Sequence, residues 1–150
     1  MKRFLSCERG TSAVELAVST PLFLLLMVGT IDMARYAYYS ILAAHAARAG
    51  VQYAAQNLQT AYDAANNGPN TAAAATHDAQ NLSNWKVTSS VICFNGGQLT
   101  ACPSSSTVPA TLLYYVSVKV TGTFNGFLSY PGIGQQVPVT GSAMMRVDTQ

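Results

Sequence analysis

Apolar and polar positions divide the chain into a long helical part and a strand-rich part. Residues 16–31 carry no formal charge and are mostly apolar. Beyond Asp32 a helical pattern continues without a break to Gly68 and Pro69, which together are a plausible stop. Apolar and small residues recur there at steps of three and four. This spacing predicts one shared face formed by Met33, Ala37, Ile41, Ala44, Ala47, Val51, Ala55, Leu58 and Tyr62.

A second, shorter helix is predicted over residues 70–85. Asn70 or Thr71 supplies its cap, and the alanines that follow have high helix propensity. Pro69, directly ahead of this segment, is consistent with a connector between two helices.

The remainder of the chain has the pattern of β-strands. Residues 85–94, 110–124 and 135–148 are rich in Val, Ile, Thr and Tyr and alternate with a period of two. We expect an antiparallel meander with one face covered by the long helix. The predicted fold class is therefore α+β, with a long N-terminal helix, a short second helix and a small sheet.

Charge is scarce and changes the interpretation of the first segment. Only 9% of the 150 residues are charged, and the net charge is +2. No basic cluster exists beyond Lys2, Arg3 and Arg9, so nucleic acid is not an expected partner. These three cations precede the apolar run, whereas Asp32 and Arg35 follow it. This asymmetry predicts a cytoplasmic N-terminus and an exported remainder, in a single pass through the lipid bilayer.

The apolar run is short for a transmembrane helix unless it begins earlier. Sixteen uncharged residues, 16–31, span roughly 24 Å, against a hydrocarbon core of roughly 30 Å. Counting from Thr11 gives twenty-one residues and roughly 32 Å, which fits. That choice places Glu15 inside the membrane. A conventional cleaved secretory signal is not expected, because the first small-x-small site, at residues 44–46, lies too far downstream.

A carboxylate in lipid is costly and requires a partner. At a helix centre an acidic residue costs about 2.5 to 3.5 kcal/mol, and less near an interface. If the chain is cut between Gly10 and Thr11, the new ammonium group at Thr11 can pair with Glu15 of a neighbouring chain. The alternative is that Glu15 reaches the headgroups, or pairs with Arg9, in an uncut signal anchor.

The run of Gly10, four residues and Glu15, behind a short basic leader and ahead of an apolar helix, resembles the processing site of type IV pilin-like proteins. Residues 9–55 resemble the TadE-like minor pseudopilins of bacterial tight adherence (Tad/Flp) pilus systems. The resemblance implies a substrate of a prepilin peptidase, with Gly10 last in the leader, Thr11 first in the mature chain and Glu15 at its fifth position. Leu16, where the small major pilins of these systems have Tyr, argues for a minor pseudopilin.

On this basis we expect a leader (1–10), a transmembrane helix (11–31), its continuation (32–68) and an exported α+β domain (69–150). The resemblance implies a bacterial inner-membrane protein with a periplasmic C-terminal domain, used in assembly of a Flp type IVb pilus. Its partners would be the prepilin peptidase, other pilins or pseudopilins and inner-membrane assembly components. The alternative function is an uncut, signal-anchored periplasmic binding or adhesion module.

Small residues in the long helix suggest where another helix packs. Ala43 with Ala47, and Ala46 with Gly50, have the small-xxx-small spacing of close helix contacts. We therefore expect Ala43, Ala47 and Gly50 to contribute to assembly. Pro21 either kinks this helix or is simply tolerated within it.

Polar and aromatic residues follow the apolar run directly. Tyr36, Tyr38 and Tyr39 are placed to form an aromatic belt at the outer headgroup layer. Asp32 and Arg35, three residues apart, can pair on the helix surface.

The cysteines predict one disulfide and no metal site. Cys7 lies in the expected leader, whereas Cys93 and Cys102 flank a predicted tight turn at residues 95–97 in the exported part. An oxidising compartment favours a bond between these two. Too few ligands accompany them for zinc, and no catalytic motif is present, so neither a cofactor nor enzymatic activity is expected.

Overall fold

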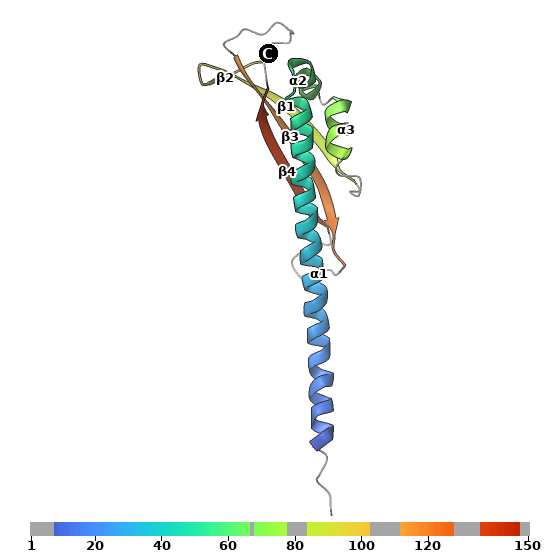
Figure 1. Ribbon diagram of the computed structural model, residues 1–150. Helices are drawn as coiled ribbons and strands as arrows, with labels where there is room; N and C mark the ends of the chain where they lie inside the picture. The colour runs from blue at the N-terminus through green and yellow to red at the C-terminus, as the bar shows by residue number, and fades with distance from the viewer. Residues whose placement is uncertain (1–7, 67, 78–83, 103–111, 128–135, 148–150) are drawn as a thin grey trace, which may run out of the picture.

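A single long helix carries a small α+β domain at its far end (Figure 1). The computed structural model describes residues 8–66, 68–77, 84–102, 112–127 and 136–147. Helix α1, Glu8–Ala54, has 47 residues and is therefore about 70 Å long. Its first half projects from the domain, and its second half packs along the sheet. Residues 1–7 of the expected leader lie outside the described ranges.

Helix α1 continues through Pro21 without interruption. Proline removes one backbone N–H from the helical ladder. In the preceding turn, the Ser19 hydroxyl donates to the Glu15 carbonyl at 2.8 Å, and the Thr20 hydroxyl donates to the Leu16 carbonyl at 2.6 Å. These side-chain bonds support the turn at the proline, so of the two interpretations of Pro21 the tolerated proline is the one observed.

The prediction of one unbroken helix to Gly68 is wrong. Helix α1 ends at Ala54, and α2, Leu58–Ala65, begins after a turn. Asn57 is extended (φ −159°), its side chain accepts from the Thr60 backbone N–H at 2.9 Å, and its own N–H donates to the Thr60 hydroxyl at 3.2 Å. This capping box starts a new helix inside a segment whose apolar period does not change.

Helix α3, Pro69–His77, confirms the predicted second helix. The predicted cap is wrong, because Asn70 and Thr71 lie inside the first turn and Ala72 N–H donates to the Gly68 carbonyl at 3.2 Å. Proline occupies its first position, where the missing N–H has no cost. The Asp63 carboxylate of α2 accepts from the Thr71 backbone N–H and from its hydroxyl, each at 3.1 Å. The predicted end at Trp85 is wrong, because Asn84 is left-handed (φ 63°) and neither it nor Trp85 is helical. Residues 78–83 lie outside the described ranges.

The sheet has four strands, and every neighbouring pair is antiparallel, as predicted. The strands are β1 (Lys86–Asn95), β2 (Gln98–Thr100), β3 (Leu112–Asn125) and β4 (Gln136–Arg146), in the spatial order β2-β1-β3-β4. Gly96 and Gly97 both have positive φ, 57° and 83°, as the tight β1–β2 turn requires. Strand β2 was not predicted, because its three residues are all exposed and give no alternation.

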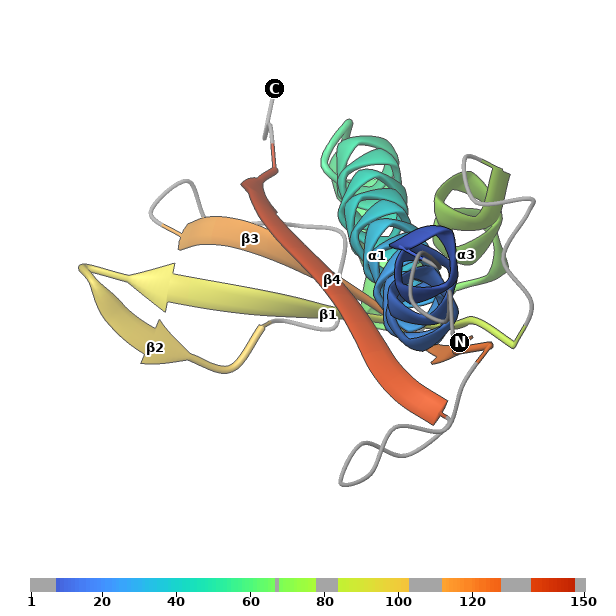
Figure 2. The same cartoon turned by 90° about the horizontal axis from the view of Figure 1, so that it is seen from below.

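The helices cover one face of the sheet (Figure 2). Helix α1 packs on β3 and β4, whereas α2 and α3 pack on β1. The β3 alternation holds as predicted: Val116, Val118 and Val120 are buried beneath the helices. Around them the core is built largely from alanine, which allows the helix backbone to lie close to the sheet.

The predicted face of α1 is buried only in part. Met33 and Ile41 are 71% and 58% exposed, whereas Ala47 and Val51 of the same face are buried. The residues of α1 buried against the sheet are mostly small, namely Ala43, Ala46, Ala47, Gly50, Val51 and Ala54. A Cβ at Gly141 of β4 would collide with the Ala43 carbonyl group, so helix and strand are in backbone contact there. Close approach, rather than side-chain size, decides which face of α1 meets the sheet.

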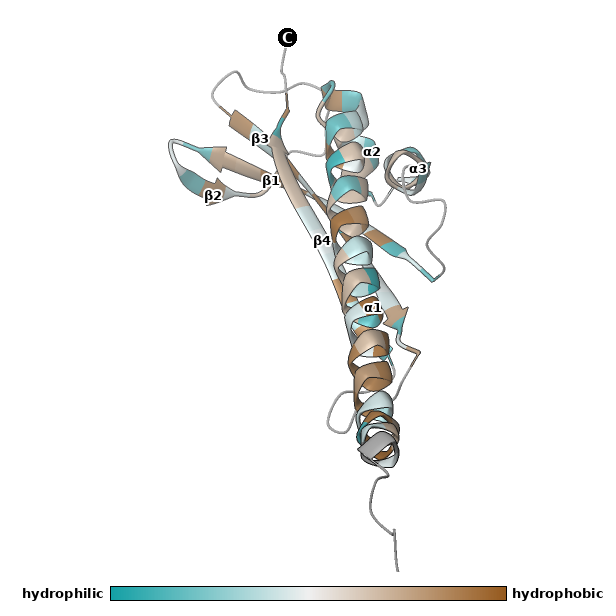
Figure 3. Ribbon diagram, turned by 60° about the horizontal axis from the view of Figure 1, so that its bottom comes forward, coloured by the Kyte–Doolittle hydropathy of each residue, from teal (hydrophilic) through white to brown (hydrophobic). Residues whose placement is uncertain are grey.

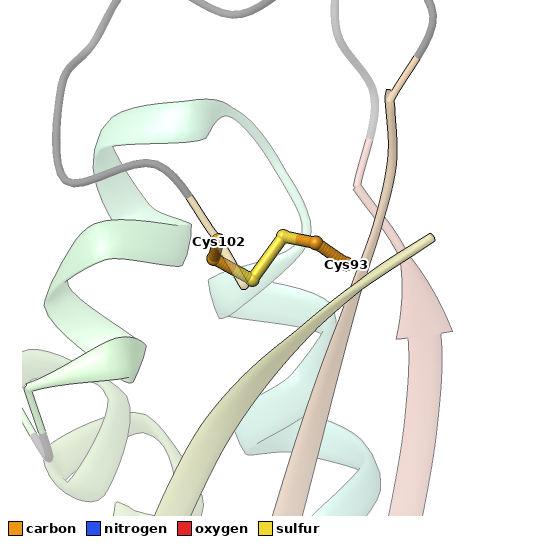
Figure 4. The surroundings of a disulfide bond; sticks show 2 residues. All are labelled: Cys93 and Cys102. Atoms are coloured by element: carbon orange, nitrogen blue, oxygen red, sulfur yellow. A yellow bond between two sulfur atoms is a disulfide. The ribbon is translucent and has the colours of Figure 1, made fainter. Parts of the chain in front are cut away.

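The predicted disulfide is confirmed. Cys93 of β1 is bonded to Cys102, with the two Cα atoms 5.3 Å apart (Figure 4). Cys93 is fully buried on the face of the sheet that the helices cover. The bond therefore closes the β1–β2 hairpin over the edge of the core.

Candidate processing and assembly surface

The expected cleavage site lies in the first turn of α1. Helix α1 begins at Glu8, so Gly10 and Thr11 are its third and fourth residues. The first four N–H groups of a helix have no intrahelical acceptor, and glycine lowers helix propensity, so this turn unwinds at little cost. A Cβ built at Gly10 meets no atom within 4 Å. A peptidase can therefore reach this bond without disturbing the folded domain.

The helix that follows is apolar on all sides and is not covered by the rest of the described chain. Within Ser12–Ala54 it contains an 18-residue window with mean hydropathy 1.9, none of which is buried. Figure 3 shows this brown segment projecting beyond the sheet. By length and composition it can cross a membrane. Its large side chains are more than half exposed, as at Val14, Leu16, Val18, Leu22, Phe23, Leu24, Leu25, Leu26 and Met27.

Glu15 lies on this uncovered segment, one turn beyond the expected cleavage site. Its carboxylate is exposed, and no ion pair or hydrogen bond involves it among the residues whose side chains the structure describes. Among the side chains that the structure describes, none neutralises this charge on the apolar segment. In lipid, the compensation has to come from another molecule, from the headgroup layer or from residues outside that set, such as Arg9.

Asp32 ends the apolar run and ties α1 to the sheet. It is only 5% exposed, and its two carboxylate oxygens accept from the Phe127 backbone N–H at 3.0 and 3.2 Å. Arg35 Nη1 lies 3.5 Å from the carboxylate, which confirms the predicted pair. The guanidinium carbon also lies over the Phe127 and Phe124 rings, 4.2 and 5.3 Å from their centroids.

This junction is more than the surface ion pair that the spacing suggested. No pattern in the sequence indicated that Phe127, ninety-five positions from Asp32, would supply a donor. An acidic residue placed directly after an apolar run was the one available signal. Carboxylate, guanidinium and two rings together hold the end of β3 against the helix at the limit of the apolar segment.

Two of the three belt tyrosines also contribute to this junction. The Tyr36 and Tyr39 rings pack on Phe124 with centroids 5.9 and 5.5 Å apart, whereas Tyr38 is 57% exposed. Of the three, only Tyr38 is exposed, with its ring centroid 6.0 Å from that of Tyr39.

The small-residue pairs contribute to the chain's own core. Ala43 and Ala47 have no exposed surface, and a Cβ at Gly50 would lie 3.0 Å from Ala75 and 3.1 Å from Val118. The prediction that these residues meet another chain is therefore corrected: β3, β4 and α3 already occupy their face. The face of α1 left open beyond the membrane segment carries Met33, Tyr38 and Ile41.

Among the described residues, no three His, Cys, Asp or Glu side chains gather as a metal site. Both described cysteines are in the disulfide.

Comparison with known proteins points to the same segment. The family model described as TadE-like protein matches residues 10–52, from the expected end of the leader to the last turn of α1. No curated protein and no solved structure matches the chain significantly. The resemblance that Gly10, Glu15 and the apolar run predicted is confirmed over these residues, where the chain is similar to the TadE-like proteins.

Proposed function

We propose that this protein is a membrane-anchored minor pseudopilin, cut by a prepilin peptidase after Gly10 and used in assembly of a tight adherence pilus. The observation that carries the proposal is the uncovered apolar helix, which coincides with the TadE-like match and begins at the expected cut. The orientation follows from Lys2, Arg3 and Arg9, which keep the N-terminus in the cytoplasm.

The cut gives Glu15 its partner. Release of Gly10 leaves an ammonium group on Thr11, four residues before the carboxylate. In lipid, an ion pair between Thr11 of one chain and Glu15 of the next replaces an isolated charge with a matched pair. Helices that meet out of register leave the carboxylate unpaired, so the pair selects one register.

The face that meets a neighbour beyond the membrane segment is the one left open in the fold. Met33 is 71% exposed, and Tyr38 and Ile41 are 57% and 58% exposed. They continue the apolar surface of the membrane segment past Asp32. A photoreactive side chain at Ile41 should crosslink to a neighbouring subunit in the assembled machinery. The matched position Ala47 should not, because it has no exposed surface.

Intact mass measurement of the protein from its native membrane tests the proposal. The expected mature N-terminus is Thr11. Gly10→Trp should retain the leader, whereas Gly10→Ala should be processed more completely. A Cβ at this position meets no atom within 4 Å outside its own turn of helix, so Gly10→Ala should leave the fold unchanged. A functional, assembled molecule that still carries residues 1–10 would contradict the proposal and favour the uncut anchor of a periplasmic binding module.

Glu15→Gln separates insertion from assembly. The variant loses the charge and should enter the membrane at least as well as the wild type. It should nevertheless be incorporated less into the assembly machinery, as measured by co-purification with neighbouring subunits. Ser12→Ala, an exposed change on the same segment, is the matched control. Incorporation of the Gln variant at the wild-type level would contradict the pairing of Glu15 with Thr11.

A further inference from the structure

The face of the sheet opposite the helices has an apolar end and a polar end. Successive residues of a strand point to opposite faces, so the positions that alternate with the buried Val116 and Val118 form this open face (Figure 2). Its polar end carries Thr88, Thr121 and Thr140. At the end that holds the β1–β2 hairpin, the open face carries apolar and aromatic residues. We call these residues the hairpin-end patch: Ile92, Phe94, Leu99, Leu113, Tyr115 and Met144.

The side chains of the hairpin-end patch are neighbours across three strand pairings. Leu99 of β2 lies opposite Phe94 of β1. The Phe94 ring meets the Tyr115 ring edge to face, with centroids 5.6 Å apart. Ile92 lies opposite Tyr115, and Met144 of β4 is its diagonal neighbour. Leu99 and Met144, at the two sides of the patch, are 71% and 61% exposed, so the patch is one continuous apolar surface open to a partner.

The charges on the open face all have the same sign among the described residues. Lys86, Lys119 and Arg146 are exposed there, and none of them has an ion pair among these residues. Arg146 lies opposite Tyr115 and therefore borders the hairpin-end patch. Every Asp and Glu that the structure describes lies instead on α1 or α2. The open face thus presents unpaired cations beside an apolar centre.

This composition is typical of a protein–protein interface. Continuous exposed apolar patches with polar surroundings mark interaction sites. The aromatic residues, Met and Arg are the residue types enriched in such sites, and Phe94, Tyr115, Met144 and Arg146 supply all of them.

We propose that the hairpin-end patch binds an acidic surface of a partner protein, with Leu99, Phe94 and Met144 in the apolar centre of the contact. Arg146 and Lys119 face the partner's carboxylates and fix its orientation. The inference goes beyond the pilus function proposed above, because it uses neither the processing site nor the open face of α1.

The position and charge of the patch favour this partner over three others. Figure 1 places the hairpin at the end of the domain away from the projecting half of α1, and residues 32–54 of the helix span roughly 35 Å, so a bilayer around the projecting half does not reach the patch. A second copy meeting it face to face would bring like charges together. Polyanions are held by more cations, roughly six to ten, than the three described here.

A photoreactive side chain at Leu99 of the full-length protein in its native membrane tests the contact. It should crosslink to another protein, and mass spectrometry of the crosslinked peptide should find more Asp and Glu than Lys and Arg. The matched position is Thr123, which is exposed at the polar end of the same face and should give no crosslink.

Two variants at the opposite side of the patch separate its apolar and charged contributions. Met144→Ser and Arg146→Gln should each lower the crosslink yield from Leu99 roughly two- to tenfold. Arg48→Gln removes the same charge from an exposed position on α1 and should leave the yield unchanged. Met144 and Arg146 are both exposed, so the thermal midpoint of each variant should equal that of the parent protein, and a lower yield then reports lost contact.

Four results would overturn the proposal. The first is a crosslink from Leu99 to lipid, to glycan or to a second copy in place of another protein. The second is a crosslinked peptide without an excess of acidic residues. The third is an unchanged yield in both Met144→Ser and Arg146→Gln. The fourth is an equal loss of yield in Arg48→Gln, because it would mean that net charge alone decides the contact.

Discussion

The two halves of α1 are one continuous helix in two different environments. In the projecting half, large side chains such as Leu22 and Phe23 are more than half exposed. In the domain half, alanines such as Ala43 and Ala46 have no exposed surface. Large residues are thus uncovered and small ones are covered, the reverse of the usual arrangement in a soluble protein. The difference shows that the first half is suited to a lipid or helical neighbour, whereas the second is suited to close contact with its own sheet.

The largest expected effect comes from filling the contact between α1 and β4. In Gly141→Ala, the new methyl group collides with the backbone carbonyl of Ala43, which belongs to the rigid helix and cannot move aside as a side chain could. We expect the domain to lose about 3 kcal/mol or more of stability, measured by urea unfolding of the full chain in nanodiscs. Gly10→Ala adds the same methyl where nothing lies within 4 Å and should leave domain unfolding unchanged. Equal stability of the two variants would mean that the helix does not lie this close to β4.

Removal of the disulfide should have the next largest effect. Cys93 and Cys102 are nine positions apart, so their bond restricts a short loop of the unfolded chain. The double variant Cys93→Ala, Cys102→Ala should lose about 2–3 kcal/mol in the same urea experiment. A reductant should destabilise the wild-type domain by a similar amount but should not affect the variant. If the reductant has no effect on the wild type, the bond contributes nothing to the fold in solution.

The junction at Asp32 should contribute less, and its effect should be local. Asp32→Ala leaves the Phe127 N–H without its acceptor and should cost about 1–3 kcal/mol at that site. Amide exchange at Phe127 should accelerate by roughly tenfold for each 1.4 kcal/mol lost, while Val118 in the centre of β3 keeps its protection. Asp32→Asn retains an acceptor oxygen, so its exchange rate at Phe127 should lie between the rates of the wild type and of Asp32→Ala. Unchanged exchange at Phe127 in the Ala variant would rule out this contact.

The smallest expected effect is the pH dependence from Tyr114. Its pKa is raised in the folded state, so above about pH 10 the unfolded chain releases the phenol proton more readily than the folded one. Stability should therefore fall as the pH rises through this range, and Tyr114→Phe should flatten the decline. Tyr38→Phe, at an exposed position, should leave the slope unchanged. An identical slope in Tyr114→Phe would show that the phenol titrates alike in both states.

Sequence patterns predicted the elements better than their packing. Alternation at Val116, Val118 and Val120 is set by the strand itself, so β3 and its buried face were predictable. The end of α1 was missed because the Asn57 capping box interrupts a helical period that continues on both sides of it. The close contact between α1 and β4 was not predictable, because Gly141 lies ninety-eight positions from Ala43, and only the folded chain shows that the two backbones meet.

The candidate site divides in the same way. Gly10 and Glu15 are local features whose spacing is visible in the chain, and the TadE-like match covers them. The Asp32 junction depends on a partner that the fold brings to the helix, the Phe127 backbone N–H. No periodic signal in the sequence marks it.

The uninterrupted course of α1 has a mechanical consequence. A rigid rod transmits displacement along its length, so a shift of the helix by one turn along its axis moves the attached sheet by about 5.4 Å. The hydrogen bonds from the Phe127 backbone N–H to Asp32 hold the end of β3 against the helix, so the sheet moves with it. A displacement applied to the projecting half of α1 would thus appear at the domain as a step of the same size.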